Sequence, residues 1–249
     1  MGLPGELLAA PGLTWLVAAA ILAGIVRGFS GFGTGMVFLP VATQVLSPVQ
    51  AITALVIMDL VGPLPNVPRA LRDGHPADVA RLGAGMLVAL PMGVWVLYVA
   101  PPELFRYAVS LLALGLLAAL VAGLRYRGPM SPPLIFGTGG LGGFLGGAAG
   151  LPGPPVILLY MASPLPPAAI RANTLLYLVL TDALLLALLG ATGGLAWSAL
   201  GLGLLLILPY TLANIAGAAL FRPERATAYR AVAYTIIAAS ALSGLPLLD

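Results

Sequence analysis

The sequence has 249 residues, of which 60% are hydrophobic and 8% are charged, and its mean hydropathy is +1.06. This composition excludes a soluble globular domain and is typical of a membrane protein with several spans. The net charge of +3 comes from scattered arginines without any lysine, which excludes the basic face of a nucleic-acid-binding protein. Because the chain has no cysteine and one histidine, His75, it has no thiolate metal site, and we expect no cofactor.

The apolar segments follow one another along the chain in two similar series. The first segment, residues 13–46, is too long for one helix and is interrupted at residues 27–35 by "RGFSGFGTG". Uninterrupted segments of about 20 residues, enough to cross a bilayer, follow at 48–68, 77–99 and 103–124. A second interrupted segment, 133–163, contains "GLPGPP" and precedes uninterrupted segments at 168–190, 196–220 and 227–246.

Each interrupted segment is predicted to form a re-entrant hairpin. Its two arms, of about 10 to 15 residues each, are too short to cross the membrane separately. Six crossings and two hairpins therefore form the predicted fold, an all-α polytopic membrane protein.

The two halves of the chain resemble each other. A shift of 119 residues places "GFSGFGTGMVFLP" (28–40) over "GAAGLPGPPVILL" (147–159), and residues 46–48 over 165–167. The sequence thus predicts two membrane repeats, 1–128 and 129–249, each a hairpin followed by three spans. With three crossings per repeat, the second repeat is inverted relative to the first.

The arginines predict the orientation of the chain in the membrane. With two re-entrant hairpins, nine of the eleven arginines gather on one side: Arg69, Arg72, Arg81, Arg125, Arg127, Arg171, Arg222, Arg225 and Arg230. Positive charge marks cytoplasmic loops, so we expect these loops inside the cell and both termini outside. An eight-span alternative divides the loop arginines almost evenly between the two sides.

The interrupted segments predict an anion site near the middle of the membrane. Helices that end there expose backbone N–H groups and positive dipole ends, and Pro154 and Pro155 suit the first turn of a helix. Arg27 adds a guanidinium for an oxyanion, and at this depth it requires a ligand or a carboxylate opposite it. The predicted substrate-binding residues are Arg27, Gly28, Ser30, Gly31, Gly33, Thr34 and Gly35 in the first tip, Gly150, Pro152, Gly153 and Pro154 in the second, and Arg171, Asn173 and Thr174 in the span that follows.

The duplicated motif "GFSGFGTGMVFLP", with "LSP" shortly after it and its echo in the second half, resembles the TauE/SafE family, also called the sulfite exporter family. The likeness covers nearly the whole chain, although the second tip departs from the family's glycine-rich form with "GLPGPP". The resemblance implies a permease of the bacterial cytoplasmic membrane that moves sulfite, organosulfonates or related anions, mostly outward. The expected partners are a small anionic substrate and the lipid bilayer, and a homodimer is one assembly that the sequence allows.

The candidate residues also have structural interpretations. The glycine spacings Gly24/Gly28, Gly31/Gly35 and Gly139/Gly143/Gly147 are equally typical of close helix packing. Arg27 can serve in a structural ion pair, Arg171 as an interface anchor, and Asn173 and Thr174 in hydrogen bonds between helices. Asp59 and Asp182 lie inside predicted spans, where a carboxylate either carries a coupling proton or bonds to neighbouring backbone.

Other functional classes share some of these features. An anion channel would use the same hairpin site. The "GFSG" at 28–31 resembles the nucleophile motif of rhomboid proteases, but the chain's one histidine is predicted in a loop, away from that serine. An aspartyl intramembrane protease would pair Asp59 with Asp182, whose flanking sequences lack that family's glycines. We therefore expect no enzyme activity.

Overall fold

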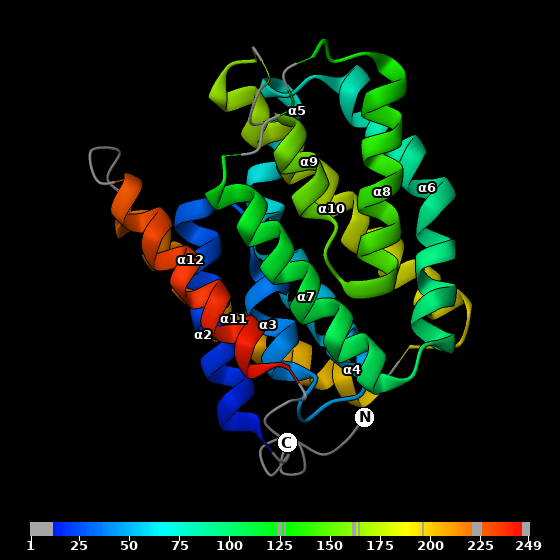
Figure 1. The fold of residues 1–249 in the computed structure, drawn as a ribbon, viewed down its shortest axis with the longest axis vertical. Coiled ribbons are helices and arrows are strands. Elements are labelled where there is room, and N and C mark those ends of the chain that lie inside the picture. Colours follow the sequence, from blue (N-terminus) through cyan, green and yellow to red (C-terminus); the bar gives the residue numbers. More distant parts are fainter. Residues whose placement is uncertain are drawn as a thin grey trace. The chain divides into compact units, whose positions relative to one another are not determined.

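The computed structural model describes residues 12–123, 126, 128–160, 163, 165–195, 197–220 and 226–245, and the regular secondary structure in these ranges is entirely helical. This confirms the all-α fold class. The helices, labelled in Figure 1, are α2 (Leu13–Ser30), α3 (Thr34–Ala42), α4 (Pro48–Val61), the short 3-10 helix η1 (Leu64–Asn66), α5 (Val67–Asp73), α6 (Pro76–Val99), α7 (Pro102–Val121), α8 (Pro132–Ala149), α9 (Gly153–Tyr160), α10 (Pro167–Ala191), α11 (Trp197–Leu220) and α12 (Ala226–Ser243).

The chain divides into two compact units. The first comprises Met1–Gly62, Ala100–Leu117 and Gly194–Asp249, and the second comprises Pro63–Val99 and Ala118–Gly193. The first unit therefore contains α2, α3, α4, most of α7, α11 and α12, and the second contains η1, α5, α6, α8, α9 and α10. Each unit combines helices from both predicted halves, and the repeats 1–128 and 129–249 stay a prediction.

Both interrupted segments are broken helices, but their arms are unequal. The first arms, α2 and α8, have 18 residues each, whereas the second arms, α3 and α9, have nine and eight. The prediction of arms of 10 to 15 residues was wrong because several glycines stay inside the helix instead of ending it. An 18-residue helix rises about 27 Å, so the first arms are almost as long as the hydrocarbon core is thick.

The glycines within α2 allow this helix to pack closely on α11 in the first unit. A Cβ atom at Gly24 or Gly28 would collide with the backbone of α11 near Tyr210 and Asn214. Gly217 of α11 has the same relation to the backbone of α2 at Ile25. Small residues let two helix backbones approach in this way. The structural interpretation of Gly24 and Gly28 as packing residues is thus confirmed.

The second unit repeats this contact between α8 and α6. Glycines of both helices lie where a Cβ atom would overlap the backbone of the other helix: Gly139, Gly143 and Gly147 on α8, and Gly85 and Gly93 on α6. Each of these two glycine-lined contacts joins a first arm of one predicted half to a long helix of the other half. The inverted relation of the halves stays a prediction.

The helix predicted over residues 48–68 ends earlier, at Val61. Three prolines follow in quick succession, Pro63, Pro65 and Pro68, and none can donate the hydrogen bond that would continue the helix. The chain instead continues as η1 and α5. At its other end α4 is well defined, because Ser47 and Gln50 form a capping box.

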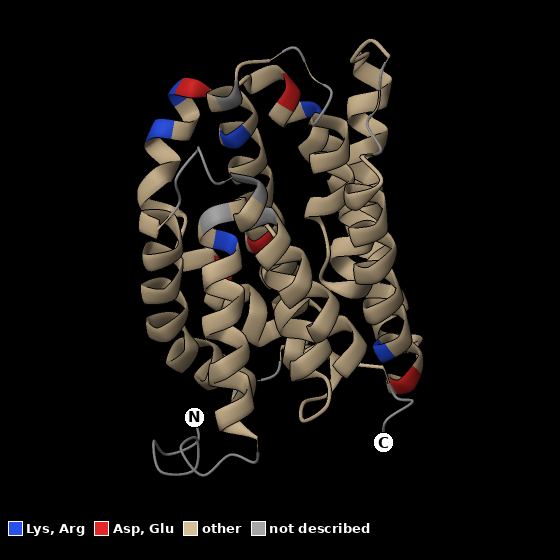
Figure 2. Ribbon diagram, turned by 60° about the vertical axis from the view of Figure 1, so that its left-hand side comes forward, with Lys and Arg blue, Asp and Glu red and all other residues tan. Residues whose placement is uncertain are grey.

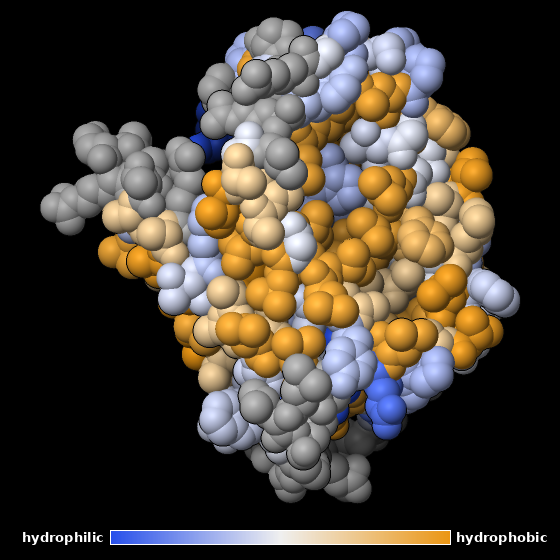
Figure 3. All heavy atoms as spheres, viewed as in Figure 1, coloured by the Kyte–Doolittle hydropathy of each residue, from blue (hydrophilic) through white to orange (hydrophobic). Residues whose placement is uncertain are grey.

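The described helices are those of a membrane protein. Four of them, Pro76–Val99, Pro102–Val121, Ala168–Ala191 and Ser198–Leu220, are long and apolar enough to cross a bilayer, and the bent pair of α4 with Leu64–Asp73 is a fifth candidate. Apolar side chains cover much of the face drawn in Figure 3, and most charged residues lie at helix ends in Figure 2. The six crossings, the re-entrant entry of the hairpins and the outward termini stay predictions. Arg125, Arg127, Arg222 and Arg225 lie outside the described residues.

The predicted orientation can be tested with cysteine labelling, because the chain has no native cysteine. His75, in the junction between α5 and α6, is exposed, as is Ala191 at the end of α10. We expect a membrane-impermeant maleimide added to intact cells to label Ala191→Cys and not His75→Cys. Labelling of His75→Cys alone would show that the orientation is reversed.

Candidate functional site

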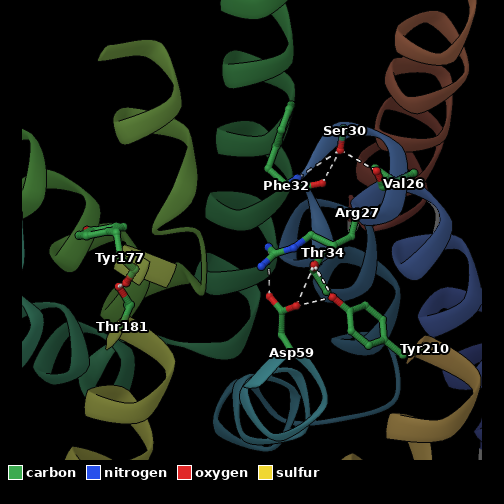
Figure 4. A network of polar contacts seen from close by, with 9 residues as sticks. All are labelled: Val26, Arg27, Ser30, Phe32, Thr34, Asp59, Tyr177, Thr181 and Tyr210. Atoms are coloured by element: carbon green, nitrogen blue, oxygen red, sulfur yellow. Dashed lines mark hydrogen bonds and ion pairs between the residues drawn. The ribbon is translucent and has the colours of Figure 1, made fainter. Parts of the chain in front are cut away.

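Four buried polar side chains meet beside the first helix break, and each comes from a different helix. The Arg27 Nη1 atom of α2 lies 3.4 Å from Asp59 Oδ2 of α4. The other carboxylate oxygen, Asp59 Oδ1, accepts a hydrogen bond from Tyr210 of α11 and one of 3.3 Å from Thr34 Oγ1 of α3. The Thr34 and Tyr210 hydroxyls are 3.1 Å apart, within hydrogen-bonding distance of each other. Figure 4 shows these four residues, named here the Arg27 cluster, converging on the carboxylate.

Two glycines at the break place Arg27 beside Thr34. Gly31 has a φ of 80°, and its N–H donates to Arg27 O at 2.8 Å, which ends α2. Gly33 has a φ of 98° and precedes the first residue of α3. A residue with a Cβ atom rarely adopts such angles, so glycine at both positions makes the sharp turn possible. A helix break is therefore observed within the predicted interruption at residues 27–35, and it brings the last turn of α2 next to the first turn of α3.

Burial makes the Arg27 cluster energetically demanding. The exposed fractions are 8% for Arg27, 6% for Asp59, 2% for Thr34 and 0% for Tyr210. A charged group removed from water is stabilised only when a counter-charge and hydrogen bonds replace the lost solvent. Here the guanidinium faces one carboxylate oxygen and two hydroxyls bond to the other. The requirement that a ligand or a carboxylate should face Arg27 is met by Asp59.

The start of α3 adds backbone donors to this region. Its N-cap is Gly33, which has no side chain to accept from the first-turn N–H groups. These N–H groups and the helix dipole give this end of α3 a partial positive charge. The Ser30 hydroxyl, by contrast, is engaged with backbone, since its Oγ lies 2.6 Å from Val26 O and 2.7 Å from Phe32 O.

The second break, in the second unit, also joins a long helix to a short one through a glycine with positive φ, but it has fewer backbone N–H donors. Gly150 has a φ of 66° and caps α8, and Leu151 N donates to Leu145 O at 3.2 Å. Helix α9 then begins with Gly153, Pro154 and Pro155, so the prediction that these prolines lie in a first helical turn is confirmed. Because proline has no N–H, this turn offers an anion fewer hydrogen bonds than the first turn of α3 does. Pro152 lies in the turn between α8 and α9.

Asn173 has a structural role in the second unit. Its Oδ1 accepts from His75 N at 2.7 Å, and its Nδ2 donates to Tyr160 OH at 3.0 Å. The side chain is fully buried and joins α10 to the end of α9 and to the start of α6. Thr174 beside it is also buried, whereas Arg171 is exposed, as expected for an interface anchor.

Asp182 is buried on α10 in the second unit, with an exposed fraction of 7%. The preceding residue is Thr181, whose Oγ1 donates to Tyr177 O at 2.8 Å (Figure 4). Tyr177 OH in turn donates to Gly139 O at 3.0 Å. The bond to Gly139 joins α10 to α8. Asp59 and Asp182, to which the sequence assigns the same candidate roles, thus lie in different units. Asp59 is the one that the contacts described above join to Arg27.

A pocket of about 390 Å³ lies in the second unit between α5, α6 and α10, and it is unsuited to an anion. Its lining consists of glycine, proline and aliphatic residues: Leu71, Gly74, Pro76, Val79, Ala80, Gly83, Ala84, Leu87, Leu176 and Leu180. None of these side chains can bind a negative charge. Within the described part of the chain, the Arg27 cluster remains the candidate site.

Sequence reasoning did not find Tyr210. A signal was available in "LPYTLAN", where a tyrosine directly after a proline and four residues before Asn214 lies within an apolar helix. Both residues lie on the face of α11 that packs against Gly24 and Gly28. A polar side chain on a glycine-lined contact between helices is a candidate partner for a buried charge.

These observations define a polytopic α-helical membrane protein with a buried arginine–carboxylate site at a helix break. The family profile described as "Sulfite exporter TauE/SafE" matches residues 16–244, and the chain belongs to this family. The chain is also 30% identical over 163 residues to the "Probable sulfite/organosulfonate exporter TauE" of Cupriavidus necator (strain ATCC 17699 / DSM 428 / KCTC 22496 / NCIMB 10442 / H16 / Stanier 337). That match spans 61% of this chain and 62% of the relative, less than two thirds of its length. No solved structure matches the chain.

Proposed function

We propose that this protein is a secondary transporter that exports a small sulfur-containing or organic anion, such as sulfite or an organosulfonate, across the bacterial cytoplasmic membrane. The family and the name of the relative support this class of substrate. The observation that carries the proposal is the buried Arg27 at a helix break, because an arginine inside a membrane protein marks an ion or substrate path.

The geometry of the first break suits an oxyanion. A guanidinium has five N–H donors in a planar fork that matches a sulfonate or carboxylate group. The first-turn N–H groups of α3 lie next to it, because Thr34, the first residue of this helix, belongs to the Arg27 cluster. Together these donors replace the water that the anion loses on entering the protein.

Arg27 and the first turn of α3 supply most of the binding energy in this proposal. The predicted role of the second tip, Gly150 to Pro154, stays a prediction, and its turn of α9 offers fewer N–H donors because it begins with Gly153, Pro154 and Pro155.

Ligand-induced stabilisation tests the proposed function. We expect methanesulfonate, sulfite or a simple carboxylate to raise the melting temperature of the purified protein, because a ligand that binds only the folded state stabilises it. At a concentration of 100 times Kd the gain is about 2.7 kcal/mol. Methanesulfonamide, a neutral molecule of similar shape, serves as the control and should have no effect.

Two results would contradict the proposal. The first is a melting temperature unchanged by every anion in the series, and the second is an equal shift with methanesulfonamide. Transport in proteoliposomes then separates a carrier from an anion channel that uses the same residues. Accumulation of the anion that is driven by an imposed proton gradient, with the membrane potential held at zero, is expected of a coupled carrier and impossible for a channel.

A further inference from the structure

The buried charged side chains that the structure describes in the first unit form a neutral pair. Among its described residues, Arg27 and Asp59 are the charged side chains classed as buried, and they face each other at 3.4 Å. If an anion binds to Arg27 while Asp59 stays ionised, the cluster gains a net charge of −1 in a medium that solvates charge poorly. Such an uncompensated buried charge costs several kcal/mol, and proteins avoid it by binding a proton or a counter-ion.

We propose that Asp59 binds one proton whenever Arg27 binds one substrate anion, so that the transported unit is one proton with one monovalent oxyanion. This inference rests on the proposed function and adds the coupling ion, its stoichiometry and the charge of the substrate. In the empty site the Asp59 carboxylate pairs with the Arg27 guanidinium. In the loaded site the substrate replaces it, and the proton neutralises the displaced carboxylate.

The two oxygens of Asp59 have separate partners, which suits this exchange. Oδ1 is held by Thr34 and Tyr210, whereas Oδ2 faces the guanidinium. When Arg27 turns to the substrate, Oδ2 loses its counter-charge and is the atom that takes the proton. The two hydroxyls donate to Oδ1 in both states, because a proton on Oδ2 leaves Oδ1 an acceptor.

Tyr210 is therefore a positioning residue in this scheme. Its hydroxyl contacts Thr34 as well as Asp59, and its ring is completely buried on α11. The groups that face the carboxylate are thus Arg27 from α2, Thr34 from α3 and Tyr210 from α11, and one of these three carries a formal charge. The net charge of the Arg27 cluster therefore depends on whether Asp59 carries a proton and whether an anion is bound.

The charge balance also defines the class of substrate. A sulfonate, hydrogensulfite or a monocarboxylate carries one negative charge and leaves the loaded site neutral when Asp59 is protonated. A dianion such as sulfate would leave a charge of −1 even then. The site should consequently select monoanions. Export of the neutral pair should be driven by the outward gradient of the anion, and the membrane potential should make no contribution to it.

Proton uptake on binding tests this scheme directly. Methanesulfonate is the probe, because it is a monoanion throughout the range from pH 5 to 8, and its binding heat is measured in buffers of different ionisation enthalpy. We expect the wild-type protein to take up close to one proton per anion at the upper end of this range. Asp59→Asn should bind methanesulfonate without proton uptake, because an amide keeps the shape of the carboxyl group and cannot be protonated in this range.

Transport by proteoliposomes gives the second measurement. Wild-type transport should be indifferent to an imposed potential and should carry protons with the anion. The loaded Asp59→Asn site carries one proton fewer, so its transport should follow the potential, with an accumulation ratio of about 50-fold at 100 mV for one net charge. Asp78→Asn is the matched control, because Asp78 pairs with Arg81 at 3.0 Å in an ion pair near the start of α6. It should retain the wild-type proton count and insensitivity to potential.

The outcomes separate this inference from the proposed function. Binding of methanesulfonate without proton uptake by the wild-type protein, or wild-type transport that responds to potential, would overturn the coupling and leave the exporter in place. Binding of sulfate as tight as that of methanesulfonate would overturn the charge selection. Absence of any anion binding would instead contradict the proposed function itself. If Asp59→Asn does not fold, the wild-type proton count alone still decides.

Discussion

Leucine in place of Gly139 is expected to destabilise the protein by about 3 kcal/mol or more, because an added side chain has no space at this helix contact. A Cβ atom at this position would overlap the backbone of Leu82, so α8 and α6 would have to separate. This contact orders the second unit, and separation would also expose the neighbouring glycines. We expect low yield of monodisperse protein and a lower melting temperature in detergent.

Gly137→Leu provides the matched control for this prediction. Gly137 lies two residues away on the same helix, and a Cβ atom there would have no neighbour within 4 Å. The same change of residue type then alters helix propensity equally without affecting the contact. Gly139→Leu protein as stable as Gly137→Leu protein would show that the α6–α8 contact does not limit stability.

Much of the helical fold can be predicted from the sequence. Long apolar segments with few charges fix the positions of α6, α7, α10 and α11 to within a few residues. The break at Gly31 and Gly33 is also predictable, because a cluster of glycine within an apolar segment favours a change of chain direction. Glycine alone, however, cannot show whether the helix continues. Gly28 remains inside α2 because of the approach of α11, which belongs to a distant part of the sequence.

The candidate site could be predicted in part. That an arginine in an apolar segment needs a partner follows from the cost of burying a charge. The choice of Asp59 over Asp182 depends on how helices pack, and neither residue carries a local signal of it. Tyr210 was missed for the same reason, since it is 151 residues from Asp59 and 176 residues from Thr34 in the chain. Contacts at such separations follow from the fold and not from a motif.

Arg27→Ala is expected to abolish the ligand-induced stabilisation of the protein, which is the largest effect we predict for a side chain in the site. The variant loses the one guanidinium of the Arg27 cluster, and hydrogen bonds to charged groups are worth about 1.5 to 3 kcal/mol each. Two such bonds correspond to a loss of affinity of at least about 100-fold. The protein should remain folded, because Tyr210 and Thr34 still bond to Asp59, and protonation can neutralise that carboxylate.

Two further substitutions resolve what the guanidinium provides. Arg27→Lys keeps the charge but loses the planar fork, so it should bind the anion more weakly than the parent and better than Arg27→Ala. Gly33→Val should also prevent binding, because valine is strained at a φ of 98° and would press on Val26, and the turn that places Thr34 would change. Arg69→Ala is the control, since Arg69 is exposed and pairs with Asp73 on the surface of α5. If Arg27→Ala binds methanesulfonate as tightly as Arg69→Ala does, then Arg27 is a structural residue, and the anion site has to be sought at Arg171.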